Sequence, residues 1–203
     1  MREPGVGRVL VASLHQAISE VLPLRLGFYE SFLPPEGLRQ GTIGIAPVSA
    51  VLSFLRQEGG TYDLVVARAG EYAAEWTVES MAPLERSFIA STPEWLRARM
   101  VLRMGGRLVR RTCEQSRATA CLRRRTARVE VRTSLFCAVR EPVNAPLCGY
   151  YAAAFARLLT VFALPTQASV ESCRGTGASS PHCVLTLSLP KVSVSPLPEE
   201  TAA

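Results

Sequence analysis

A chain of 203 residues, with 48% hydrophobic and 20% charged residues, is long enough to bury one full core and fits one domain rather than two. No apolar run reaches the roughly 18 residues of a transmembrane helix, and His15, Gln16 and Glu20 interrupt the N-terminal stretch where a signal peptide would stay apolar. The sequence therefore predicts a single cytoplasmic domain over residues 1–190, followed by a flexible tail over residues 191–203.

The net charge of +6 comes almost wholly from arginine, because Lys191 is the only lysine. Arginines cluster over residues 97–111 and again over residues 123–132. No aromatic residues alternate with them, and no nucleic-acid-binding motif accompanies them. We expect a solvated face and no nucleic-acid partner, with a phosphate-binding or membrane-surface patch as the alternative.

Apolar spacing and capping residues predict helices throughout the first half of the chain. Gly105-Gly106 is expected to kink or stop the last of them. The predicted helices cover Val9–Leu22, Leu24–Leu33, Val48–Gln57, Asp63–Met81 and a segment from Ser91 at least to Met104.

The second half alternates strands with one helix. A hairpin is predicted over Ala118–Arg124 and Ala127–Ser134, then a helix from Leu147 to about Ala163, then a second hairpin over Thr166–Cys173 and Cys183–Leu189. This order predicts an α+β domain with a four-stranded antiparallel sheet and helices packed on one side.

Six cysteines in a chain without an export signal indicate reduced thiols or metal ligands rather than disulfides. Cys148 opens the last predicted helix, and Cys173 and Cys183 stand at neighbouring ends of the second hairpin. Soft thiolates from such positions can hold a structural zinc ion. The alternative is that they pack as small buried hydrophobes.

The segment from Cys148 to Cys183 resembles the C-terminal half of the vinyl-4-reductase-type hydrocarbon-binding domain, which shares the fold of transport-protein-particle (TRAPP) subunits. Its members include the sensory domains of phenol-responsive activators and a small protein of bacteriochlorophyll synthesis. The resemblance implies a TRAPP-like fold and a zinc site made by Cys148, Glu171, Cys173 and Cys183. Two spacings differ from the family: Glu171 lies two residues before Cys173 rather than three, and the following loop is longer. Cys137 or His182 is therefore an alternative fourth ligand.

The helix after Cys148 carries aromatic side chains beside alanines, a pattern typical either of a pocket for a flat apolar ligand or of plain core packing. Trp76 and Trp95 are weaker candidates for the same wall, and His15 receives no role. The predicted ligand-binding residues are Tyr150, Tyr151, Ala154, Phe155, Leu158 and Phe162.

Together these features predict a stand-alone domain that binds or senses a small hydrophobic or aromatic molecule. Two alternatives stay open. One is a tetrapyrrole-biosynthesis protein, either an accessory of a 4-vinyl reductase or a carrier of the pigment precursor, although no nicotinamide or flavin motif supplies a hydride. The other is a structural subunit that forms a homodimer through its N-terminal helices.

Overall fold

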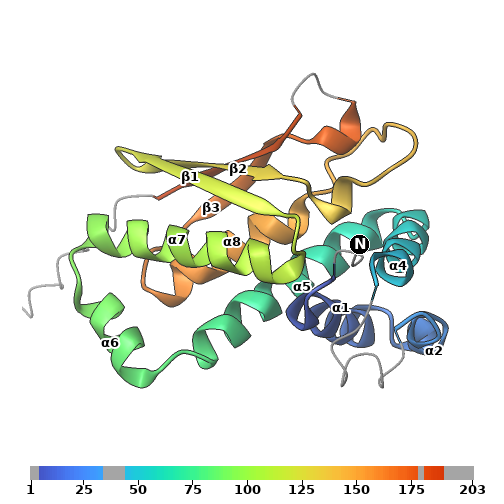
Figure 1. Ribbon diagram of the computed structural model, residues 1–203, viewed down its shortest axis with the longest axis horizontal. Coiled ribbons are helices and arrows are strands. Elements are labelled where there is room, and N and C mark those ends of the chain that lie inside the picture. Colours follow the sequence, from blue (N-terminus) through green and yellow to red (C-terminus); the bar gives the residue numbers. More distant parts are fainter. Residues whose placement is uncertain (1–4, 34–43, 178–180, 190–203) are drawn as a thin grey trace, which may run out of the picture.

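The computed structural model describes residues 5–33, 44–177 and 181–189 (Figure 1). The predicted tail lies outside these residues. The helices are α1 (Arg8–Val21), η1 (Pro23–Arg25), α2 (Leu26–Glu30), α4 (Ile45–Gln57), α5 (Gly60–Glu79), α6 (Pro83–Ser91), α7 (Glu94–Thr112), η2 (Leu135–Cys137), α8 (Gly149–Val161) and η3 (Arg174–Thr176). The strands are β1 (Arg117–Arg123), β2 (Thr126–Arg132), β3 (Gln167–Ser172) and β4 (Cys183–Ser188).

The four strands form one antiparallel sheet in the order β1-β2-β4-β3. The two hairpins are joined in the middle of the sheet, where Val131 of β2 lies opposite Cys183 of β4. Apolar residues alternate along β2, with Ala127, Val129 and Val131 buried on the face that meets the helices. The predicted α+β class and the four-stranded sheet are confirmed.

The helices form a layer against one face of the sheet (Figure 1). Among the strands, α7 packs mainly on β1 and α8 mainly on β3, while α5 packs along α8 and α1 packs along α5. Gly70 of α5 permits the close approach of α5 to α8, because a Cβ atom at this position would lie 2.2 Å from the carbonyl oxygen of Tyr150. The buried centre of the domain therefore lies around α8.

Two helical features differ from the expectations. Helix α6 was not predicted, and only Ile89 of its nine residues is buried. Helix α7 continues through Gly105-Gly106 to Thr112, so these glycines neither stop nor divide it. At Gly105 a Cβ atom would lie 2.1 Å from the ring of Phe155, so this glycine serves close packing between α7 and α8.

The N-terminal helices are only partly available as an interface. Leu10, Leu14 and Ile18 of α1 are fully buried, whereas Leu24 and Phe28 are exposed. A homodimer stays a prediction. No single helix in the described part of the chain is long and apolar enough to cross a membrane. Helix α1 and the stretch Pro23–Glu30 pass that test only as a pair bent by 117°.

Candidate functional site

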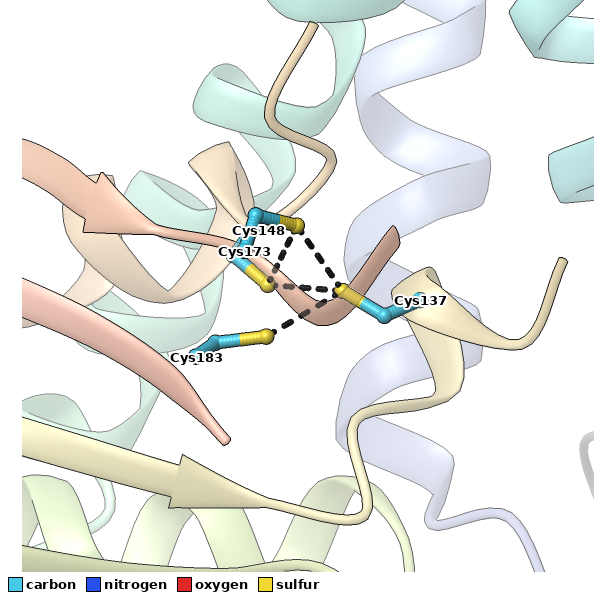
Figure 2. A group of neighbouring side chains, drawn as sticks. All are labelled: Cys137, Cys148, Cys173 and Cys183. Carbon is cyan, nitrogen blue, oxygen red and sulfur yellow. Dashed lines mark hydrogen bonds between the residues drawn. The ribbon is translucent and has the colours of Figure 1, made fainter. Parts of the chain in front are cut away.

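Four buried cysteines meet at one end of the sheet: Cys137, Cys148, Cys173 and Cys183. Their sulfur atoms all lie within 4.8 Å of one another. The Sγ atom of Cys137 is 2.9 Å from that of Cys148 and 3.3 Å from those of Cys173 and Cys183, and Cys148 and Cys173 are 3.8 Å apart (Figure 2). We call this group the cysteine cluster.

Each sulfur comes from a different local structure. Cys137 ends the short turn η2 that follows β2, and Cys148 is the residue immediately before α8. Cys173 follows β3 and precedes η3, while Cys183 is the first residue of β4. The pairing of β2 with β4 brings the first and last of these segments together, and the start of α8 lies at the same end of the sheet (Figure 2).

The arrangement fits a tetrahedral metal ion with four sulfur ligands. Structural zinc takes four such ligands at Zn–S distances of about 2.3 Å, which places the sulfurs of an ideal tetrahedron about 3.8 Å apart. The Cys148–Cys173 separation of 3.8 Å equals this value, whereas the three contacts of Cys137, at 2.9 to 3.3 Å, are shorter. Several are shorter than the roughly 3.5–4.0 Å that non-bonded heavy atoms prefer, so four protonated thiols would be crowded here.

Without a metal ion, the four thiols differ in how readily each loses its proton. Hydrogen bonds from Cys137 and the other cysteines, together with the Leu147 N–H at 3.3 Å, hold the pKa of Cys173 below its usual range. Hydrogen bonding with Cys137 raises the pKa of Cys148, and burial adds to this effect. A metal ion would replace these shared protons, because thiolates and not thiols are its ligands.

Polar side chains from α4 and α5 hold the backbone beside the cluster. The hydroxyl of Tyr62 donates to the carbonyl of Leu147 at 3.1 Å, next to Cys148. The guanidinium of Arg56 donates to the carbonyl of Phe136 at 3.3 Å, next to Cys137, while its buried Nε–H has no partner among the described residues. The positive charge of the Arg56 guanidinium would offset part of the net negative charge of a zinc ion held by four thiolates.

Glu171 does not join the cysteines. It lies on the exposed side of β3, where its carboxylate accepts a hydrogen bond of 3.0 Å from Thr186 Oγ1. The β3–β4 register shifts between Val170 and Ser172, so Glu171 is the extra residue of a β-bulge, and strand alternation no longer places it on the side of Cys173. Cys137 stands in its place, and His182 is not one of the four.

The six residues proposed for a ligand pocket are all buried in and just after α8. The ring of Tyr150 stacks on Phe136 at 4.8 Å, and its hydroxyl lies 3.3 Å from Ser13 Oγ. The hydroxyl of Tyr151 lies 3.4 Å from Thr112 Oγ1. In this conformation the side chains pack as a core against α1 and α7.

The remaining candidates lie elsewhere. Trp76 stacks on Tyr72 and Trp95 is largely exposed, so neither joins the side chains of α8. His15 pairs with Glu30 at 2.9 Å. A groove of about 840 Å³ runs between α7 and β1, away from the cysteine cluster and from the side chains of α8, and Trp95 lies next to it, with its ring 5.5 Å from the guanidinium of Arg99. Sequence reasoning did not anticipate this groove, although the regular spacing of arginines along residues 99–110 was a visible signal.

No family model matches the sequence, and no curated protein matches it. Among solved structures, the domain is similar to the crystal structure of the phenol-responsive sensory domain of the transcription activator PoxR with phenol. The TM-score is 0.55 at 15% sequence identity, over 71% of this chain and 74% of that chain. This likeness establishes the fold. It agrees with the predicted TRAPP-like architecture, while a vinyl-reductase relationship stays a prediction.

Proposed function

We propose that the domain binds a small hydrophobic or aromatic molecule and that a zinc ion held by Cys137, Cys148, Cys173 and Cys183 fixes its ligand-binding core. The observation that carries the proposal is the convergence of four buried sulfurs within 4.8 Å. The ligands come from both hairpins and from the start of α8, so one ion would tie together the elements that surround the buried aromatic residues.

The donor set favours a structural rather than a catalytic ion. Four thiolates complete a tetrahedral shell, whereas catalytic zinc commonly keeps one position open for water or substrate. All four cysteines are at most 5% exposed, so solvent has little access. The ion would contribute to the free energy of folding, by about 10–16 kcal/mol in small zinc-finger peptides.

Metal analysis tests the zinc centre. We expect one zinc per chain by elemental analysis, and after exchange for cobalt we expect the absorption bands of a tetrahedral thiolate site. The Cys148→Ser variant should lose the metal and unfold at a much lower temperature. Cys121→Ser is the matched control, because Cys121 is exposed on β1 and outside the cluster. A metal-free protein whose melting is unchanged by a chelator, or four cysteines found in disulfides, would contradict the proposal.

The ligand part of the proposal rests on the fold shared with a phenol-responsive domain and on the aromatic and alanine side chains of α8. The buried side chains must separate to admit a ligand, and the interface of α8 with α5 is rich in small residues that make such a rearrangement sterically simple. Gly70, Ala73 and Ala74 of α5 are buried there.

Titration of the zinc-loaded protein with phenol and larger aromatic compounds tests this part. A ligand at about 100 times its Kd should stabilise the fold by about 2.7 kcal/mol, visible as a saturable rise in Tm. Ala154→Leu should weaken the ligand, whereas Ala153→Leu at a half-buried position of the same helix is the control. If no compound raises Tm while the zinc content stays complete, the ligand proposal fails and the metal proposal stands.

A further inference from the structure

We propose that the groove between α7 and β1 binds an extended acidic segment of a partner protein, which adds a strand to the free edge of β1 and pairs its acidic side chains with the arginines of α7. The groove has a volume of about 840 Å³ and is lined by one face of α7, by most of β1 and by Arg132. This surface is separate from the cysteine cluster and from the side chains of α8.

The charge of the groove has one sign. Arg99, Arg103, Arg107 and Arg110 lie along α7, and Arg117 and Arg132 lie at the end where β1 begins. The groove lining contains no acidic residue. Within residues 5–33, 44–177 and 181–189, no ion pair joins any of these six arginines to a carboxylate. Such a concentration of unpaired positive charge attracts an anionic partner.

The backbone of β1 offers a second means of recognition. Among the residues that the structure describes, β1 is an edge of the sheet and pairs only with β2. Alternate residues of an edge strand direct N–H and C=O groups away from the sheet, where an added strand can pair with them. Small residues at Gly106, Ala118 and Ala120 keep the space between helix and strand open. A helix beside an open edge strand is a geometry that suits strand addition.

The spacing of the arginines matches an extended chain. Residues four apart on a helix are separated by about 6.0 Å along its axis, and alternate residues of a strand by about 6.6 Å. A peptide with acidic residues at every second position could therefore place one carboxylate near each of Arg99, Arg103 and Arg107. Its intervening side chains would face the opposite side of the extended sheet.

Other occupants fit less well. A second copy of this chain would bring its own arginine row against the first, which like charges oppose. Single-stranded nucleic acid prefers aromatic platforms, and the lining contains no aromatic residue. The arginine row is about 16 Å long by helical rise, so a compact anion would contact only part of it.

Fluorescence anisotropy with the full chain tests the inference. The probe is a labelled peptide of about eight residues in which glutamate alternates with threonine. We expect it to bind at least about tenfold more tightly than a peptide of the same composition with its glutamates consecutive, and than an alternating lysine peptide. Methylation of alternate backbone nitrogens, tried in both registers, should abolish binding in one register, because it removes the donors that pair with β1.

Charge reversal locates the site. Arg103→Glu with Arg107→Glu should weaken the alternating peptide by at least about tenfold. Arg111→Glu with Arg128→Glu makes the same change in net charge at exposed positions outside the groove, and we expect at most about a threefold loss through long-range electrostatics. Gly106→Leu fills the groove without changing charge and should also block binding, while circular dichroism confirms its fold.

Four results would overturn the inference: equal losses in the two charge-reversal variants, full binding by Gly106→Leu, no preference for alternating glutamates, or full binding by both methylated peptides. Tighter binding of a single-stranded oligonucleotide, lost in the Arg103 and Arg107 variant, would assign the groove to nucleic acid instead.

Discussion

Cys137 is the residue that distinguishes this cluster. It belongs to a short turn after β2, and its sulfur makes the shortest contact of the group, 2.9 Å to Cys148. Glu171 occupies the bulge of β3 and bonds to Thr186 on the exposed side. A thiolate in place of a carboxylate makes the site all-sulfur, which favours zinc over harder cations.

Substitution of the two residues should separate their roles. Cys137→Ser should lose the zinc, because a hydroxyl is a poor ligand for it, and the loss should appear in elemental analysis and as a lower Tm. Glu171→Gln should keep a full equivalent of zinc and nearly the parent Tm, since its hydrogen bond is exposed and contributes little. Loss of zinc from Glu171→Gln would show that the carboxylate reaches the ion.

The sequence predicted three of the four residues of the cysteine cluster but not the position of Glu171. Cys148, Cys173 and Cys183 follow from their places at element ends, and the structure brings them together. Cys137 was only an alternative, because a three-residue turn after a strand has no periodicity to predict its direction. The bulge at Glu171 depends on pairing with β4, so strand parity within β3 alone cannot reveal it.

Among the elements, α7 packs against two neighbours, α8 and β1, through two adjacent glycines. Gly105 faces α8, where Phe155 fills the space that a side chain would need. Gly106 faces β1, where a Cβ atom would make an ordinary contact of 3.5 Å with the carbonyl oxygen of Ala118. The two glycines therefore have different physical reasons to be present within one helix.

Alanine at each position should change stability in opposite directions. Gly105→Ala overpacks the Phe155 ring, which costs about 1–3 kcal/mol and exceeds the gain of up to about 1 kcal/mol in helix propensity. Gly106→Ala should keep most of that gain. Denaturant unfolding of the two variants measures the difference, and equal stability of both would mean that Phe155 moves aside without cost.

The elements themselves were largely predictable, because apolar residues at helical or strand spacing and turn residues between them mark α1, α5, α8 and the two hairpins. The continuation of α7 was not, since a glycine pair normally weakens a helix and only the ring of Phe155 explains its use here. Helix α6 has a proline at its start and apolar residues at Leu84, Phe88 and Ile89, but its nine residues are too few for a clear helical period, and only Ile89 is buried.

Across the whole molecule, several tyrosines are enclosed by packing. Burial raises the pKa of Tyr62, Tyr150 and Tyr151 well above the usual value near 10. Their contribution to stability is complete below that value. Above it the unfolded chain releases protons that the folded domain keeps, so stability falls as pH rises.

Alkaline unfolding checks this expectation. Each tyrosine that stays protonated should lower the free energy of unfolding by about 1.36 kcal/mol per pH unit above pH 10. Urea unfolding of the zinc-loaded protein at increasing pH gives the slope, and tyrosinate absorbance should appear together with unfolding. Tyr150→Phe should reduce the slope by the share of one tyrosine. An unchanged slope would mean that Tyr150 ionises within the folded domain.

The central pairing of β2 with β4 has a consequence for the speed of folding. Val131 and Cys183 are distant in sequence, and the entropy lost in closing such a loop precedes any gain from the strand ladder. An ion bound by Cys137, Cys148, Cys173 and Cys183 would divide this long loop into short ones while the chain is still unfolded. The metal would then act as a nucleation point, so that besides stabilising the folded domain it would shorten the time during which the newly made chain is exposed to aggregation.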